Sequence, residues 1–488
     1  MSAIGHADLQ ELARQEMIAN GFEPEFPPAA QAQLQSINAH PPALAPGSEV
    51  RDLRGLLWSS IDNDTSRDLD QIEVAERLAN GSVRVLVGIA DVDAFVPART
   101  PIDDHAAIET TTVYTGVRNF PMLPEALSTG ASSLLEGADK LCLVIETNVG
   151  PDGVVKDGGV YRAIARNKAQ LAYGAVGAWL ESRGPAPPKV AASSELQGQL
   201  KLQSEVAQAL RRERFRHGAL DIDTIETRPV VLNEQVIDLA REDTNDATEL
   251  IEDFMIASNG AVARLLEARR VSSIRRIVRV PKRWDRIVEL ASTLGTRLPA
   301  TPDSKALNQF LAARRAADPD HFPDLSLSVI KLMGPGEYVL ERPGDPDTGH
   351  FGLAVQDYTH STAPNRRYAD LVTQRLIKAV LAGHAAPYSD DELSRIAATC
   401  TAKEDAARKV ERAMSKRIAA VAMSRRIGDQ FDAIVTGVTP RGTFVRVLQP
   451  HVEGLLAQGQ QGVDVGDRLR VRLVHTDVER GFIDFARA

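Results

Sequence analysis

Four aspartates within nine residues are the feature that most constrains what this 488-residue chain can fold into. They are Asp62, Asp64, Asp68 and Asp70, and no lysine lies between them. Carboxylates this close repel one another unless a cation neutralises them, and Mg²⁺ prefers a few carboxylates while keeping water for a substrate phosphate. In extended backbone Asp68 and Asp70 face one side while Leu69 points into the core. A polar turn capped by aspartates is the alternative interpretation, whereas an EF-hand loop is disfavoured because its central Gly and terminal Glu are missing.

The composition is that of an ordinary globular protein. The chain has 43% hydrophobic and 25% charged residues, and 57 Lys and Arg against 66 Asp and Glu give a formal net charge of −9. This balance excludes disordered, collagen-like and disulfide-scaffold classes, and two cysteines cannot form a disulfide framework. Neither a signal peptide nor an apolar run long enough for a membrane span is visible, so we expect a cytoplasmic protein. The acid excess argues mildly against a nucleic-acid partner.

Changes in the helix and strand patterns along the chain predict three domains. Residues 1–50 contain two helical patterns separated by prolines, typical of a small helical domain or, less commonly, a helix-turn-helix relative. Residues 51–427 mix strand and helix patterns: strands are expected over 56–61, 83–89 and 141–149, and helices over 194–215, 247–269 and 389–427. Residues 428–488 alternate with regular Gly-rich turns, and strands near 431–436, 442–447, 468–474 and 481–485 predict a small closed β-barrel of the OB kind. The expected fold class is therefore α+β.

The aspartate segment resembles the signature of the RNase II/RNase R (RNB) family of exoribonucleases, which has four aspartates after a strand. Further colinear blocks carry the resemblance over residues 51–427. They are Ile89–Val92, Tyr114, Phe120–Glu125, Asn167–Tyr173, Glu252–Asn259, His350–Leu353 and Tyr358–Leu371. The C-terminal barrel is similar to the S1 RNA-binding domain that follows the catalytic body in this family. The resemblance implies a large RNB-type catalytic body with an S1-type barrel after it.

The chain departs from the family pattern at two points. The family's fourth aspartate falls at Gln71, a neutral ligand at best, which leaves open whether one or two ions bind. Asp64 is a peripheral substitute with the wrong spacing. The family usually has two cold-shock barrels ahead of the catalytic body, and 50 residues are too few to hold them.

The resemblance assigns the hydrolytic roles. Asp62, Asp68 and Asp70 are the expected Mg²⁺ ligands, and Asp70 is the one whose loss should impair catalysis most. Arg366 is the expected catalytic arginine, because a guanidinium can fork onto two phosphate oxygens and stabilise transition-state charge. A surface ion pair is the alternative for a lone arginine. Arg367, beside it, is assigned to RNA binding.

The remaining assignments concern RNA. By the resemblance, Tyr114 contacts the 3′-terminal nucleotide and sets the length of the final product. Tyr173 packs on a base farther from the 3′ end. Glu252, and more weakly Glu411, are candidates for contacting a ribose 2′-hydroxyl, or are simply helix-surface carboxylates. Phe444 is either a stacking platform of the barrel or part of its core. The family's aromatic ring opposite the second tyrosine is replaced here by Ile222.

Residues 264–286 carry nine basic side chains against two acidic ones, which indicates either a phosphate track or a solvated helix face. Taken together, the sequence predicts a monomeric, processive, Mg²⁺-dependent 3′→5′ exoribonuclease. We expect it to degrade single-stranded RNA to nucleoside 5′-monophosphates and to leave a short oligonucleotide. The main alternative is an RNA-binding protein on the RNB scaffold with impaired catalysis, and a small-molecule phosphoesterase is a weaker one. The net charge is then the sum of an acidic metal cluster and local cationic patches.

Overall fold

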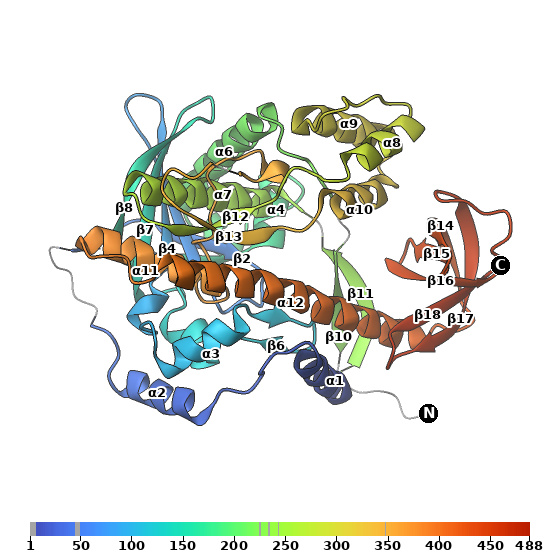
Figure 1. Ribbon diagram of the computed structural model, residues 1–488, viewed down its shortest axis with the longest axis horizontal. Coiled ribbons are helices and arrows are strands. Elements are labelled where there is room, and N and C mark those ends of the chain that lie inside the picture. The colour runs from blue at the N-terminus through green and yellow to red at the C-terminus, as the bar shows by residue number, and fades with distance from the viewer. Residues whose placement is uncertain (1–5, 44–48, 224–225, 233–234, 243, 347) are drawn as a thin grey trace.

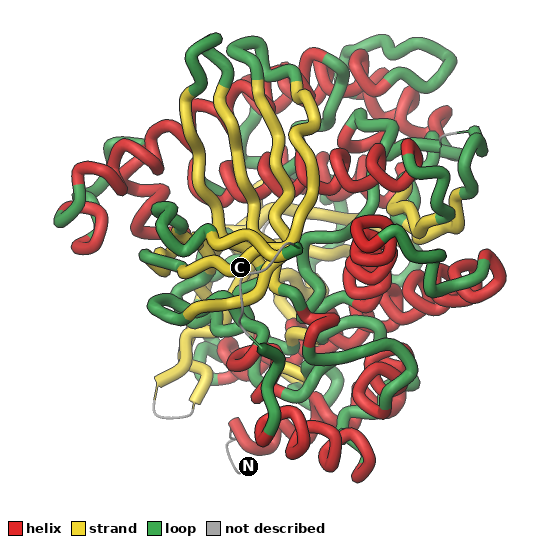
Figure 2. Tube along the Cα trace, turned by 90° about the vertical axis from the view of Figure 1, so that its left-hand side faces the viewer, coloured by secondary structure: helices red, strands yellow, loops and turns green. Residues whose placement is uncertain are grey.

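The computed structural model describes residues 6–43, 49–223, 226–232, 235–242, 244–346 and 348–488. Its centre is a sheet of seven strands: β1 (Val50–Asp52), β2 (Ser59–Asp62), β3 (Gln71–Arg77), β4 (Val83–Ala90), β7 (Asp139–Val149), β8 (Val155–Arg166) and β9 (Ala169–Ala172). The strand order is β1-β8-β7-β4-β3-β2-β9. The five central strands, β8, β7, β4, β3 and β2, pair antiparallel to one another. The edge strands β1 and β9 pair in parallel with β8 and β2. Figure 2 shows the long strands side by side with helices packed beside them.

Helices surround this sheet (Figure 1). They are α3 (Pro101–Glu109), α4 (Tyr173–Leu180), α5 (Pro188–Ala191), α6 (Ser194–Arg216), α7 (Asp246–Ala268), α11 (Tyr368–Ala382) and α12 (Asp390–Ser424). The three helices expected at 194–215, 247–269 and 389–427 are confirmed within a few residues. Side-chain caps fix where they begin: Ser193 accepts from the third residue of α6, and capping boxes at Asn245 and Ser389 start α7 and α12.

The sheet is buried on both faces. β4 is buried at seven of its eight positions, and such near-continuous burial requires cover on either side. Trp58, Ile61, Leu69 and Ile72 belong to the same core cluster as Phe254 of α7. Strand β2 ends at Asp62 and β3 begins at Gln71, so the aspartate-rich connection emerges from a rigid, fully packed edge.

The N-terminal helices α1 (His6–Ala19) and α2 (Pro28–Ala39) confirm the expected helical region. Leu9, Ala13 and Met17 of α1 are buried in a cluster with Val410 and Met414 of α12. Helix α2 packs instead beside α3, and its Ala30 joins the main core. The two helices therefore dock on different parts of the body, unlike a helix-turn-helix, whose helices pack on one another.

The C-terminal strands form the expected closed barrel. They are β14 (Gln430–Thr439), β15 (Gly442–Val447), β16 (Val452–Gln458), β17 (Arg468–Asp477) and β18 (Phe482–Arg487), in the order β14-β15-β16-β18-β17. Four of these were predicted from alternation, and β16 was not. Ala420 and Met423 of α12 lie in the barrel's core cluster with Phe431 and Phe485, so the long helix attaches the barrel to the body.

Smaller elements complete the body. Short pairs of strands are β5 (Val113–Tyr114) with β6 (Asn119–Phe120), β10 (Glu226–Leu232) with β11 (Gln235–Glu242), and β12 (Ser273–Ile277) with β13 (Glu337–Glu341). Helices α8 (Trp284–Thr293), α9 (Ser304–Ala317) and α10 (Phe322–Met333) share a separate core cluster. Within the described ranges, no helix is both long and apolar enough to cross a bilayer. Both cysteines are buried free thiols.

Candidate active site

The aspartate segment is a turn anchored at both ends. Oδ1 of Asp62, the last residue of β2, accepts hydrogen bonds from the Asn63 N–H at 2.7 Å and from the Ser66 hydroxyl at 2.8 Å. Leu69 is fully buried, and its N–H donates to Oγ of Ser133 at 2.9 Å. Leu69 thus points into the core as the alternation predicts, and it fixes the aspartates on either side of it.

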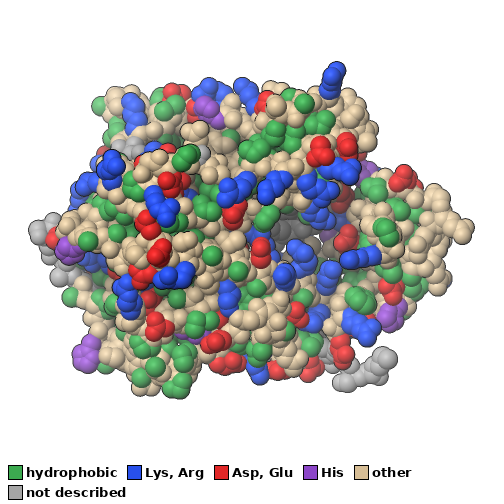
Figure 3. Space-filling model, in the orientation of Figure 1, with side chains coloured by type: hydrophobic (Ala, Val, Ile, Leu, Met, Phe, Trp, Pro, Cys, Tyr) green, Lys and Arg blue, Asp and Glu red, His purple; other side chains and the backbone are tan. Residues whose placement is uncertain are grey.

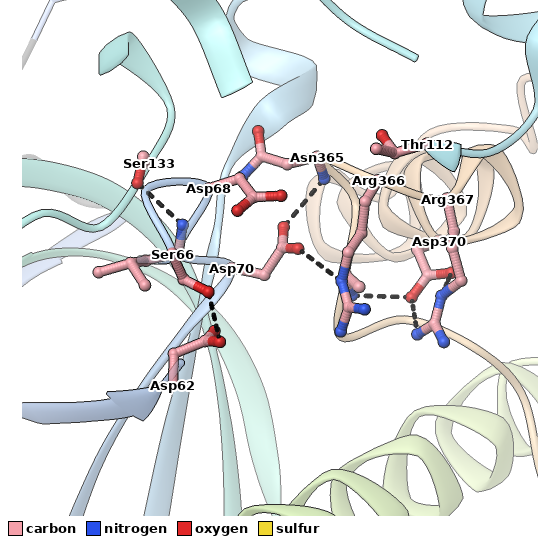
Figure 4. A network of polar contacts seen from close by, with 12 residues as sticks. Asp62, Ser66, Asp68, Asp70, Thr112, Ser133, Asn365, Arg366, Arg367 and Asp370 are labelled. Carbon is pink, nitrogen blue, oxygen red and sulfur yellow. Dashed lines mark hydrogen bonds and ion pairs between the residues drawn. The ribbon is translucent and has the colours of Figure 1, made fainter. Parts of the chain in front are cut away.

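A loop from much later in the sequence, which carries Asn365 and Arg366, contacts this turn (Figure 4). The Asn365 N–H donates to Oδ1 of Asp70 at 2.9 Å, and Nε of Arg366 lies 3.4 Å from Oδ2 of Asp70. This loop is itself held by two contacts: the Ser132 hydroxyl donates to Oδ1 of Asn365, and the Thr112 N–H donates to the Arg366 carbonyl. The fold therefore brings the aspartate and the arginine, 296 positions apart, into one ion pair.

The two neighbouring arginines have different surroundings. Arg367 donates to both oxygens of the buried Asp370 carboxylate, each at 2.8 Å, so its guanidinium is held by the first turn of α11. The Arg366 side chain is 46% exposed, whereas its partner Asp70 is 1% exposed. Arg366 therefore keeps donors free toward solvent while one edge is fixed by Asp70.

Burial dominates the electrostatics of the two aspartates closest to the sheet. It raises the pKa of Asp70 to about 7, and the nearby Arg366 charge and the Asn365 N–H only partly oppose this effect. Burial also raises the pKa of Asp62, against the hydrogen bonds from Asn63 and Ser66. Burial thus disfavours the ionised form of both carboxyls, and a cation bound between them would restore it.

The raised pKa of Asp70 predicts a pH-dependent stability of the metal-free protein. A carboxyl whose folded pKa exceeds its ordinary value of 3.8 stabilises the fold while protonated, and this contribution is lost as pH rises through about 7. Asn cannot ionise, so the melting temperature of Asp70→Asn in EDTA should exceed that of wild type by about 2–5 °C at pH 8. The excess should shrink as pH falls below 7, to less than half at pH 5, and vanish only below the ordinary pKa of 3.8. The exposed variant Asp391→Asn should show no such trend, and a pH-independent difference for Asp70→Asn would contradict the buried charge.

The structure places both tyrosines beside the aspartates. The Tyr114 hydroxyl donates to Oδ2 of Asp68 at 2.9 Å, and its N–H donates to Oε1 of Glu411 on α12 at 3.1 Å. The Tyr114 residue is nevertheless 39% exposed, so the ring has an open face. Tyr173 is the first residue of α4 and is partly buried; burial and the charge of Asp62 raise the pKa of its hydroxyl.

Two other sequence-predicted residues lie in different surroundings. Glu252 is on α7 with its side chain 50% exposed, and its carboxylate lies 3.8 Å from Arg211 of α6. Phe444 is partly buried on β15 and is not a member of the barrel's core cluster, which argues against the core alternative for it. Ile222 packs against the α8–α10 cluster.

The prediction of a phosphate track over residues 264–286 is wrong for its central part. Arg275 and Arg276 lie on β12, at 2% and 8% exposure, and pair with Glu341 and Glu404. Arg279 pairs with Glu337. A count of charges along the chain cannot distinguish a buried ion pair from a cationic surface, and here α12 and β13 supply the compensating acids.

Basic side chains do line a cleft in another part of the molecule, beside the C-terminal barrel. Figure 3 shows Lys and Arg side chains around a hollow between the body and the C-terminal barrel. A cleft between α10, β11 and the barrel is lined by Arg241, Arg426 and Arg446, together with Asp320 and Phe431. Arg446 of the barrel is held at 2.7 Å by Asp324 of α10, so the two walls of this cleft are joined by an ion pair.

The residues fit a divalent cation bound jointly with substrate. In the described part of the chain, no group of three or more His, Cys, Asp or Glu is gathered closely enough to hold an ion. However, Oδ2 of Asp70 is buried and accepts no hydrogen bond; its charged neighbour is Nε of Arg366 at 3.4 Å, so the oxygen keeps lone pairs that a cation could use. Mg²⁺ characteristically takes one or two carboxylates, several waters and substrate phosphates, and does not need a complete protein cage.

Sequence reasoning missed two residues of this region. Asn365 contributes through its backbone N–H and a buried amide, neither of which has a sequence signal. Glu73 of β3 is fully buried, and neither of its carboxylate oxygens accepts a hydrogen bond from the described residues. It shares one face of β3 with Gln71, because alternate residues of a strand point to the same side.

Known proteins resemble the chain over nearly its whole length. It is 29% identical over 518 residues to ribonuclease R 1 of Lactococcus lactis, covering 99% of the chain and 61% of that relative, and thus spans less than two thirds of it. It is 30% identical to ribonuclease R of Thermotoga maritima, covering 94% of the chain and 68% of the relative. The solved structure of Mycoplasma genitalium RNase R with ribose-methylated single-stranded RNA has the same fold, with a TM-score of 0.85 at 22% identity over 99% of the chain and 78% of that structure.

Domain profiles agree with this similarity. The profile of the C-terminal S1 domain of RNase II-type exonucleases matches residues 429–488, which form the barrel. The RNB domain profile matches residues 50–383, more than half of the chain, including the aspartate turn and the Asn365–Arg367 loop. The chain therefore belongs to the RNB-domain family.

Proposed function

We propose that this protein is a processive 3′→5′ exoribonuclease that hydrolyses single-stranded RNA to nucleoside 5′-monophosphates with Mg²⁺ and leaves a short oligonucleotide. The observation that carries the proposal is the Asp70–Arg366 pair: a buried carboxylate, whose Oδ2 accepts no hydrogen bond, forms an ion pair with a half-exposed guanidinium. Membership of the RNB family and the likeness to an RNase R bound to single-stranded RNA support it.

In this proposal Asp62, Asp68 and Asp70 would hold the ion. When bound, Mg²⁺ lowers the pKa of a coordinated water and neutralises phosphate charge. Asp70 also orients Arg366 by holding its Nε edge, so that the remaining guanidinium donors can fork onto phosphate oxygens as charge develops. Arg367, whose side chain is 25% exposed, would fix the loop that carries Arg366 through Asp370 and would contact RNA with its exposed edge.

The tyrosines and the barrel would hold the RNA. We propose that the exposed ring of Tyr114 stacks on the 3′-terminal nucleotide and sets the final product length, while Tyr173 packs on a base farther out. Glu411 would act by fixing the Tyr114 backbone, in addition to any contact with a 2′-hydroxyl. Glu252, on the exposed surface of α7, and Phe444, on the outer face of β15, would contact RNA away from the aspartates.

The test is digestion of 5′-labelled single-stranded RNA with Mg²⁺ and with EDTA. We expect rapid loss of full-length RNA, release of nucleoside monophosphates, and a single short labelled end product, all abolished by EDTA. A 3′-phosphate-blocked or hairpin-ended RNA serves as the substrate control. Absence of cleavage products with Mg²⁺, or unchanged cleavage with EDTA, would contradict the proposal.

Gln71 favours one alternative, an RNA-binding protein with impaired catalysis, because a neutral amide replaces a family carboxylate at the first residue of β3. The same digestion distinguishes the two. If the alternative holds, labelled RNA binds in a filter or gel assay and stays intact with Mg²⁺. Cleavage by wild type that is lost on substituting Asp70 would exclude it.

A further inference from the structure

Tyr114 contacts the aspartate turn through its hydroxyl, which the proposed stacking of its ring does not use. The hydroxyl donates a hydrogen bond to Oδ2 of Asp68 at 2.9 Å, across 46 positions of the chain. Oδ1 of Asp68 accepts no hydrogen bond from the described residues. Tyr114 therefore occupies one oxygen of this carboxylate and leaves the other one free.

The backbone of Tyr114 is fixed by contacts that do not involve the hydroxyl. Its N–H donates to Oε1 of Glu411 on α12 at 3.1 Å, and the strand β5 that it ends pairs with β6. Two residues earlier, the Thr112 N–H donates to the Arg366 carbonyl at 2.9 Å. The tyrosine is thus held by the long helix and by the arginine loop, and from this support its hydroxyl reaches Asp68.

The orientation of the Asp68 carboxylate matters for a divalent ion. Asp68 is partly exposed, so close packing restrains its side chain less than that of the buried Asp70. Mg²⁺ requires near-ideal octahedral geometry, whereas Ca²⁺ accepts carboxylates through one or both oxygens in irregular geometry. Hydrogen bonds from outer groups orient ligating carboxylates, and their loss typically weakens metal binding by about 10–100-fold.

We propose that Tyr114 is a positioning residue for the metal ligand Asp68: its hydroxyl holds Oδ2 and presents Oδ1 to the cation. The inference rests on the proposed function in that it takes Asp68 as a ligand of the divalent ion. Because Oδ2 is occupied by the hydroxyl, Asp68 binds through a single oxygen, which favours Mg²⁺ over Ca²⁺. The side chain proposed to hold the 3′-terminal nucleotide thereby also orients a ligand of the ion.

The direct test is metal binding by Tyr114→Phe, which keeps the ring and removes the hydroxyl. Electron paramagnetic resonance of free Mn²⁺ gives the Kd of the full chain, and Mg²⁺ and Ca²⁺ are titrated against bound Mn²⁺. Each titration is run without RNA and with a ribose-methylated single-stranded oligonucleotide that supplies substrate phosphates. We expect the Kd values for Mn²⁺ and Mg²⁺ to rise at least about tenfold over wild type. The Kd for Ca²⁺ should change by less than about threefold, because Asp68 can then bind it through both oxygens.

The matched control is Tyr161→Phe, which removes a hydrogen bond of the same kind, from a tyrosine hydroxyl to the Glu146 carboxylate at 2.9 Å on the central sheet. Its metal affinities should equal those of wild type. A Kd for Mg²⁺ of Tyr114→Phe within about threefold of wild type would overturn the proposal. Equal rises for Mg²⁺ and Ca²⁺, or no Mn²⁺ binding by wild type in either condition, would overturn it as well.

A double-mutant cycle tests whether the hydroxyl acts through Asp68. In Asp68→Asn the charge that the hydroxyl orients is absent, so adding Tyr114→Phe should change the Kd for Mn²⁺ by less than about twofold. The same fold-loss in both backgrounds would show that the hydroxyl acts elsewhere and would overturn the proposal. Tyr114→Leu also lacks the hydroxyl and should weaken Mn²⁺ binding as Tyr114→Phe does, which keeps the test available if one variant does not fold.

The length of the final RNA product separates this inference from the proposed function. Tyr114→Phe keeps the stacking ring and should leave the end product of wild type, whereas Tyr114→Leu should lengthen it. Failure of the proposed function would appear as intact RNA with wild-type protein that still binds Mn²⁺. Failure of this inference alone would appear as wild-type metal affinities for Tyr114→Phe in a protein that cleaves RNA.

Discussion

Asp70→Asn is expected to lower the rate of RNA hydrolysis by at least about a thousandfold while RNA binding persists. In the proposed site Asp70 would combine two roles, because Oδ2, which accepts no hydrogen bond, would serve the cation while it also pairs with Nε of Arg366. Asparagine keeps the shape and can still accept the hydrogen bond from the Asn365 N–H, but it has no charge for either role. Single-turnover cleavage and equilibrium binding of the same labelled RNA measure the two quantities separately.

Binding by Asp70→Asn should equal or slightly exceed that of wild type, because a negative charge near the phosphates is removed. Asp391→Asn, an exposed aspartate in the first turn of α12, is the matched control and should leave both quantities unchanged. Loss of RNA binding together with cleavage would contradict the role assigned to Asp70. So would a loss of cleavage that higher Mg²⁺ concentrations fully restore, since that would limit Asp70 to recruiting the ion.

Arg366→Ala should reduce single-turnover cleavage by about 10²–10³-fold, with RNA affinity changed by less than about fivefold. The guanidinium stabilises charge that develops only as the phosphodiester breaks, so its loss appears in the rate and not in ground-state binding. Arg366→Lys keeps the charge but cannot form two parallel hydrogen bonds, and it should recover less than about tenfold of the lost rate.

The control for this position is Arg342→Ala, which removes a solvent-exposed arginine paired with Asp390 and should have no effect on cleavage. A cleavage rate for Arg366→Ala within about threefold of wild type would show that the Asp70–Arg366 pair is only structural. Equal losses in rate and affinity would instead place Arg366 among the groups that bind RNA without acting in the transition state.

The local parts of this fold could be predicted from sequence because their signals are local. Capping residues predicted α12 from Ser389, alternation predicted four of the five barrel strands, and the burial of Leu69 followed from its place between two aspartates. Helices α8 to α10 were not predicted, since their apolar residues pack mainly on one another in a cluster apart from the main core.

The site was predictable in its acids but not in its pairing. The aspartates and Arg366 carried a resemblance, and the spacing of three between Arg367 and Asp370 is a local signal for their ion pair. Nothing local indicates that the Asn365 N–H meets Asp70, 295 positions away. For the basic residues of 264–286 the sequence led to a wrong expectation, namely that they form an exposed surface. Arg275 and Arg276 looked exposed in sequence because their partners, Glu341 and Glu404, are far away along the chain.

The long helix α12 sets the distance between Tyr114 and the C-terminal barrel, the two ends of the proposed RNA path. Glu411 holds the backbone of Tyr114, and twelve positions later Met423 lies in the core of the barrel. At 1.5 Å per residue these points are about 18 Å apart along a single continuous helix. If RNA is held at Tyr114 as proposed, it would reach the barrel only while its remaining length exceeds this span. Longer RNAs would then contact the protein at two points and shorter RNAs at one.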